Sequence, residues 1–234
     1  IMALAGKTTL DAVSEDYAGM QSGTVLSPFL AAAAFSRGYS PASLVWDLPR
    51  PVVDDSEPLT REVAVQFRGP IRLRTALISD RLNPLEDLIE TLGPRNTWRL
   101  VRPLGINSLE NAYAPEKLLE GGGSVSLLEI AQGMNVFANL GDLYGLSIVT
   151  GEALQPSTLL AVEDTYGDSM FEKDIIQRQP VLSAPLAYLT HNVLSDEPMR
   201  RAELGYPNPF ELGRPAGSRY GSTKDGREIW AAGY

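Results

Sequence analysis

The sequence predicts an α+β protein. Helix-start signals lie in the middle of the chain, and short strand-like segments lie near both of its ends. The N-terminal segment is apolar and ends at Gly6, whereas residues 217–234 contain two apolar stretches around the polar turn at residues 224–226. We therefore expect a single domain over residues 1–234, with a central helical region and terminal strands that share one sheet.

The first two predicted helices begin at proline. Pro28 lies in the first turn of an alanine-rich segment that runs to Phe35. Pro84 opens a second segment, which Gly93 ends. In this second segment leucine and isoleucine recur at helical spacing, which predicts one buried face.

The third predicted helix has the clearest start. Ser126 and Glu129 have the spacing of a capping box, and Gly141 ends the segment. A fourth helix is expected over residues 185–194. The apolar stripe of the third helix is typical of a core-facing side and consists of Leu127, Ile130, Ala131, Met134 and Phe137.

Composition excludes several classes of function. The formal net charge is −9, from 29 acidic and 20 basic residues, which argues against a nucleic-acid partner. There is no cysteine, so disulfides and thiolate–metal sites are excluded. Nothing approaches a run of about 18 apolar residues, so we expect no membrane span in this chain. No signature of a cofactor is present.

The first residue is Ile1, not methionine. We therefore expect that a targeting or anchoring segment precedes this chain.

Several segments together resemble a known family. They are residues 23–29 (Gly-Thr-Val-Leu-Ser-Pro-Phe), 69–77 (Gly-Pro-Ile-Arg-Leu-Arg-Thr-Ala-Leu), 121–129 (Gly-Gly-Gly-Ser-Val-Ser-Leu-Leu-Glu) and the C-terminal stretch 213–234. In order and approximate spacing they are similar to the transpeptidase domain of class A penicillin-binding proteins. The resemblance implies a penicillin-binding-protein/serine β-lactamase-like fold, an antiparallel sheet flanked by helices, incomplete at the C-terminus. It also implies an extracytoplasmic location and membrane anchoring through a segment outside this chain.

The resemblance also implies an acyl-transfer site. In the family a Ser-x-x-Lys motif provides a nucleophilic serine and a lysine base on one helical face. A Ser-x-Asn motif relays protons, and a Lys-Thr-Gly strand provides a cation for the substrate carboxylate. Two backbone N–H groups, one of them on that strand, hold the oxyanion.

None of the three motifs survives in this chain. No serine has lysine three residues later, no serine has asparagine two residues later, and Lys-Thr-Gly does not occur. A slip of one residue would bring Asn83 to the asparagine position, but the proline that follows argues against it. The motif-equivalent positions are Thr24 (nucleophile), Ser27 (lysine), Asp80 (serine), Leu82 (asparagine) and Arg219, Tyr220 and Gly221 (Lys-Thr-Gly).

These replacements predict a pseudoenzyme. The Thr24 methyl group crowds attack, and the Ser27 hydroxyl does not titrate near neutrality. Loss of an activating base costs roughly two to four orders of magnitude in rate. We expect a non-catalytic module that binds peptidoglycan stem peptides or serves as a scaffold, with ligand contacts at Arg219, Gly221 and Ser222. The alternatives are an assembly subunit of a membrane-associated complex and, last, a D,D-transpeptidase with a Thr24 nucleophile.

Each candidate residue also has a structural interpretation. We interpret Thr24 and Ser27 as residues that cap a helix start, and Asp80 as a turn or capping residue instead of a buried acid. Arg219 is interpreted as half of a surface ion pair, with carboxylate binding in a cleft as the alternative.

Three further residues are interpreted as structural. His191 is the single histidine, so it is expected to be packed or at the surface and not a metal ligand. Trp46 and Trp98 are expected to be core or subdomain anchors.

Overall fold

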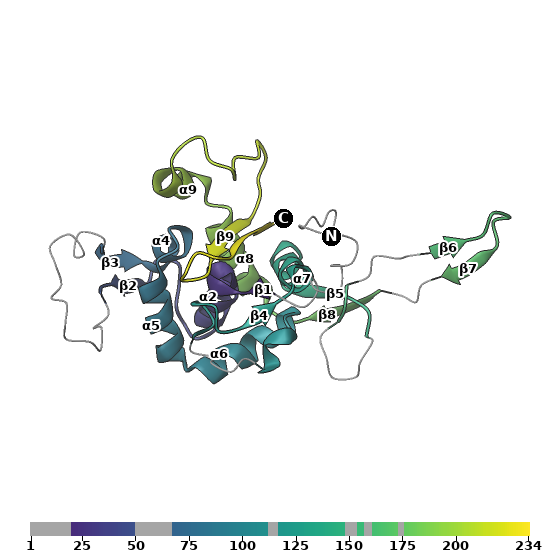
Figure 1. The fold of residues 1–234 in the computed structure, drawn as a ribbon, viewed down its shortest axis with the longest axis horizontal. Coiled ribbons are helices and arrows are strands. Elements are labelled where there is room, and N and C mark those ends of the chain that lie inside the picture. The colour runs from purple at the N-terminus through teal and green to yellow at the C-terminus, as the bar shows by residue number, and fades with distance from the viewer. Residues whose placement is uncertain (1–19, 50–66, 112–116, 148–153, 157–160, 173–175) are drawn as a thin grey trace.

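The structure is a computed structural model that describes residues 20–49, 67–111, 117–147, 154–156, 161–172 and 176–234 (Figure 1). The predicted strand that ends at Gly6 lies outside these residues. None of the described helices has the length and apolar content that a membrane span requires.

A buried helix forms the centre of the molecule (Figure 1). The 3-10 helix η2 (Gly23–Leu26) leads directly into α2 (Ser27–Ser36), and every residue from Ser27 to Phe35 is buried. The sequence explains this burial, because alanine and phenylalanine leave α2 with no polar face. Helices α4, α5, α6 and α8 all pack against it.

Helix α5 confirms the second predicted helix, whereas α4 and α6 on either side of it were not predicted. Helix α4 spans Leu73–Ile78, α5 spans Leu82–Leu92 and α6 spans Pro94–Val101. Helix α5 begins two residues before Pro84 and ends at Gly93, whose φ is 81°. Its leucine and isoleucine face is buried, as predicted. Two 3-10 helices, η3 (Arg102–Leu104) and η4 (Ser108–Asn111), follow.

Helix α7 (Leu127–Ala138) has the predicted capping box. The Ser126 Oγ accepts a bond from the Glu129 backbone N–H at 3.2 Å, and the Glu129 carboxylate accepts one from the Ser126 N–H at 3.0 Å. The apolar side of α7 packs on α2 through the rings of Phe137 and Phe29, whose centroids are 5.5 Å apart.

Two helices precede the C-terminal hairpin. Helix α8 (Ala184–Leu194) confirms the fourth predicted helix. Helix α9 (Glu197–Leu204) was not predicted, because its sequence is charged and carries no apolar stripe. The Asp196 side chain caps it by accepting a bond from the Met199 N–H at 3.1 Å.

The described strands form five antiparallel pairs. Strand β1 (Met20–Gln21) pairs with β4 (Ser124–Val125), β2 (Leu44–Asp47) with β3 (Gly69–Arg72), β5 (Asp142–Gly145) with β8 (Gln177–Pro180), β6 (Ala161–Glu163) with β7 (Ser169–Glu172), and β9 (Ser218–Ser222) with β10 (Ile229–Gly233). The mixed α+β class and the C-terminal hairpin are confirmed. The shared terminal sheet stays a prediction, because it depends on residues outside the described part.

Two of the strand pairs lie at opposite sides of the helical body. Figure 1 shows β2 and β3 at one side, and the β6–β7 hairpin standing away from the body at the other. Within β2 side chains alternate between exposed and buried, which places Trp46 on the outer face at 58% exposure. The core alternative is therefore wrong for Trp46, whereas Trp98 is partly buried and packs against the core.

Candidate functional site

The site forms where β9 lies against η2, two elements almost 200 residues apart. At this crossing the backbones touch, so glycine is required on both sides. A Cβ on Gly23, whose φ is 56°, would lie 2.3 Å from the Ser222 carbonyl oxygen. A Cβ on Gly221 would lie 2.3 Å from the Val25 nitrogen. The contact sets Thr24 directly beside the strand.

The Thr24 hydroxyl makes tertiary hydrogen bonds. Its Oγ1 donates to the Asp80 carboxylate at 2.8 Å and accepts from the Ser222 backbone N–H at 3.0 Å. The side chain is 4% exposed. The Thr24 hydroxyl therefore already accepts from the β9 N–H that faces it, and it donates its own proton to the Asp80 carboxylate.

Arg219 and Asp80 form a buried ion pair behind Thr24. The guanidinium donates to Asp80, to the Leu77 carbonyl and to the Thr24 carbonyl, the last at 3.1 Å from Nη2. The two side chains are 4% and 10% exposed. The interpretation of Arg219 as half of an ion pair is confirmed, but the pair is buried and not at the surface. Such a pair depends on both partners being present.

Asp80 combines the two roles that the sequence left open. It lies in the turn between α4 and α5 with a φ of 55°, a left-handed conformation that aspartate tolerates better than most residues. The same turn aims its carboxylate at Thr24 and Arg219. The acid is therefore a turn residue and a mostly buried one.

Neither Thr24 nor Ser27 caps a helix, so that interpretation is wrong. Leu26 occupies the N-cap position of α2 and has helical backbone angles, because η2 continues into α2. A capping side chain needs an extended residue at that position. The Ser27 side chain is fully buried, and its Oγ has no hydrogen-bond partner among the described residues.

The remaining motif positions lie around this centre. Leu82 begins α5 and packs partly buried against the core. Along β9 burial alternates, so Arg219 and Gly221 face inward, while the Tyr220 ring packs against Phe210 at 6.4 Å between centroids. The structure thus gathers Thr24, Asp80, Arg219 and Ser222 through direct hydrogen bonds.

His191 lies elsewhere, on α8. Its Nδ1 is 3.0 Å from the Tyr234 hydroxyl, whose pKa is raised by burial. It is a packed histidine, as predicted. Among the described residues no three acidic or histidine side chains gather as metal ligands would.

Known proteins with similar sequences and structures are penicillin-binding proteins. The chain is 28% identical to penicillin-binding protein 1C of Escherichia coli K12 over 214 residues, which is 90% of this chain and 24% of that protein. It matches the structure of PonA1 from Mycobacterium tuberculosis with a TM-score of 0.73 at 17% identity, over 98% of this chain and 61% of the other. The fold is that of a penicillin-binding-protein transpeptidase domain.

A second structure agrees with this assignment. Penicillin-binding protein 1A of Haemophilus influenzae matches with a TM-score of 0.69 at 21% identity, over 92% of this chain and 36% of that one. The predicted resemblance to class A penicillin-binding proteins is confirmed over most of the chain. No family model matches. This chain spans about a quarter of the length of the curated relatives that it matches.

Within this transpeptidase fold, two contacts of the site were not predicted from the sequence, although one of them had a signal there. The Leu77 carbonyl accepts from Arg219, and a backbone carbonyl carries no residue-type signal. The bond between Thr24 and Asp80 joins residues 56 positions apart. The sequence did carry one signal for this bond, because Thr24 and Asp80 both align with family motifs that contribute to one site.

Proposed function

We propose that this chain is a non-catalytic transpeptidase-like module that acts as a scaffold on the extracytoplasmic side, near the cell wall. One observation carries the proposal. The hydroxyl at the nucleophile position donates to an aspartate that is paired with arginine, and it accepts from the strand N–H.

Acyl transfer requires a base that takes the hydroxyl proton. A neutral lysine amine is a strong base. The ordinary pKa of an aspartate is lower than that of a lysine by about six units, so its carboxylate is a much weaker base. Two lysines are among the described residues, Lys117 and Lys224, and neither hydrogen-bonds Thr24. Lys224 instead pairs with Glu120 at 3.0 Å. The geometry thus offers Thr24 a hydrogen-bond acceptor but no efficient base.

Acyl transfer also requires free donors for the oxyanion. The Ser222 N–H is 3.0 Å from the Thr24 oxygen and already donates to it. A substrate carbonyl would have to displace that bond. Both observations favour a site that holds the fold together over one that turns over substrate.

Fluorescent penicillin tests the absence of catalysis. We expect no covalent adduct on the full chain by denaturing gel and intact mass, beside an active class A penicillin-binding protein that labels in the same reaction. The matched variant is Thr24→Val, which removes the hydroxyl and keeps the branched shape. An adduct on the natural chain that disappears in Thr24→Val would establish the enzyme and end the proposal.

Stem-peptide binding is the finer question within this proposal. Arg219 is the predicted ligand contact, but its guanidinium is satisfied by three internal acceptors. We therefore favour the scaffold over peptide binding at Arg219. Titration of the chain with a labelled stem peptide tests this, and saturable binding that Arg219→Lys weakens would restore the ligand version.

A second candidate function is an assembly subunit of a membrane-associated complex. The observation that favours it is the β6–β7 hairpin, which stands away from the body and exposes Tyr166 at 90% and Met170 at 73% (Figure 1). Exposed aromatic and methionine side chains are common at protein interfaces. A partner that copurifies with the natural chain and is lost in a Tyr166→Ser, Met170→Ser variant would support it. Unchanged copurification would count against it.

A further inference from the structure

A pocket lies next to the Thr24 site, between α2, α4, α8, α9 and β9. Its interior volume is about 30 Å³, which is room for two or three water-sized groups, and it opens to solvent. Most of its wall is apolar and comes from Pro28, Leu77, Val193, Leu204 and Phe210. Its polar lining includes Ser27, Asp196, Arg200, Ser218 and Arg219.

Arg200 is unusual among the charged groups of this chain. It is 7% exposed, and its one side-chain hydrogen bond among the described residues is to the Ser218 hydroxyl. No carboxylate of the described residues lies within ion-pair distance of it. Burial lowers the pKa of its guanidinium, although Glu197, Glu211 and Asp196 raise it at longer range. An arginine stays charged at neutral pH, so a buried positive charge faces the pocket without a direct counter-ion.

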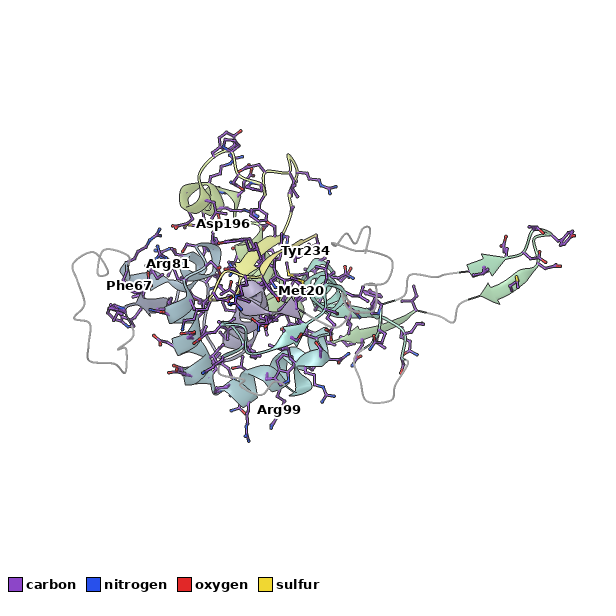
Figure 2. The ribbon with its side chains drawn as sticks, viewed as in Figure 1. Met20, Phe67, Arg81, Arg99, Asp196 and Tyr234 are labelled. Carbon is purple, nitrogen blue, oxygen red and sulfur yellow. The ribbon has the colours of Figure 1, made fainter. Side chains whose placement is uncertain are left out.

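The neighbouring acid does not neutralise Arg200 directly. The Asp196 carboxylate also lines the pocket, but Arg74 binds it at 2.5 Å and the Met199 N–H donates to it. Figure 2 shows Asp196 at the base of α9, where that helix joins the body. Its charge is therefore already balanced by Arg74.

Ser27 provides a second, independent indication of a ligand. It is fully buried, it lines the same pocket, and its Oγ has no partner in the described structure. A buried hydroxyl without a partner is unfavourable unless a ligand or water satisfies it. A hydroxyl without a partner and a guanidinium without a counter-ion thus line one apolar-walled space.

We propose that this pocket binds a small carboxylate with a short apolar body, held by Arg200 and with Ser27 as an added donor. A carboxylate matches both the fork geometry of a guanidinium and the hydroxyl donor. The apolar wall excludes a strongly hydrated or multiply charged anion. The ligand is either a free short-chain acid or the C-terminal carboxylate of a peptide. The site does not depend on whether Thr24 can be acylated.

Nuclear magnetic resonance titration of the full chain tests the proposal. We expect sodium propionate to shift the signals of pocket residues saturably, with a dissociation constant of about 1 mM. Propionamide has the same shape without the charge and should produce no saturable shift. Sodium chloride at equal ionic strength is the second control. N-acetyl-alanine distinguishes the sources, since tighter binding than propionate indicates a peptide terminus, and weaker binding indicates a free acid.

Two variants assign the site, and a third is their control. Arg200→Met keeps the buried stem and should weaken propionate at least tenfold, whereas Arg201→Met, on the exposed neighbour, should not change it. Ser27→Ala should weaken it about threefold. The spectra themselves report whether each variant folds, and the comparison of propionate with propionamide needs no variant. Absence of saturable shifts, equal effects of the acid and the amide, or an unchanged dissociation constant in folded Arg200→Met would each overturn the proposal.

Discussion

Replacing Arg219 by methionine tests the buried ion pair most directly. Methionine keeps most of the apolar stem and removes the charge, so the Asp80 carboxylate, 10% exposed, loses its partner in a buried place. Two backbone carbonyls, of Thr24 and Leu77, lose their donor as well. Breaking one side of a buried pair costs about 3–5 kcal/mol. For a chain of this size that corresponds to a fall in melting temperature of about 6–20 °C.

The matched control is an arginine in an exposed pair. Arg178 binds Asp142 at 2.8 Å, but its side chain is 65% exposed. The same change, Arg178→Met, should cost less than about 1 kcal/mol because water screens the pair. Urea denaturation followed by tryptophan fluorescence measures both free energies of unfolding.

A double-variant cycle isolates the pair itself. Asp80→Asn removes the carboxylate and keeps a residue that tolerates a positive φ. The variant with both Arg219→Met and Asp80→Asn should be more stable than the sum of the single losses predicts, by about 1–3 kcal/mol. If Arg219→Met costs no more than Arg178→Met, or if the two losses simply add, the buried pair described above is refuted.

Three further predictions concern other parts of the chain. Gly221→Ala should destabilise by about 1–3 kcal/mol or more, because the new Cβ meets backbone of η2; thermal unfolding measures this, and a neutral result would mean that β9 does not touch η2. Ser126→Ala should cost about 0.5–2 kcal/mol through loss of the capping box, and equal urea midpoints for the two proteins would contradict it. The bond from Arg201 lowers the pKa of Glu211 from 4.5 to about 2, so its contribution to stability is present above pH 4.5 and is lost as pH falls towards 2. Glu211→Gln should flatten the pH dependence of the urea midpoint over that window, and an unchanged slope would show that the carboxylate is not held.

Local signals were enough to predict helices α2, α5, α7 and α8, but not α4, α6 or α9. The capping box at Ser126 and the proline at position 28 mark backbone events that depend on a few neighbouring residues. The C-terminal hairpin is also local, because a polar turn separates its two strands. Helix α9 was not predicted because it has no apolar stripe. A capping aspartate and ion pairs support it instead.

The site was predictable in its positions but not in its bonding. The alignment of motifs placed Thr24, Asp80 and Arg219 together, and the hydrogen bonds confirm that they meet. The roles assigned to their side chains failed where they rested on nearby sequence alone. Thr24 bonds a strand 198 residues away instead of capping its own helix, and only the packing of β9 on η2 determines that partner.

The shared pocket of Ser27 and Arg219 limits which side chains position 27 can accept. Both residues line the same space, so Ser27→Lys would place an ammonium in the same pocket as a buried guanidinium. The Asp80 carboxylate already pairs with that guanidinium, so the added ammonium would share one buried acid with it, and we expect the variant to be less stable. Arg219→Met would remove the competing cation, but it would leave Asp80 without its ion-pair partner. The three positions are therefore hard to change one substitution at a time.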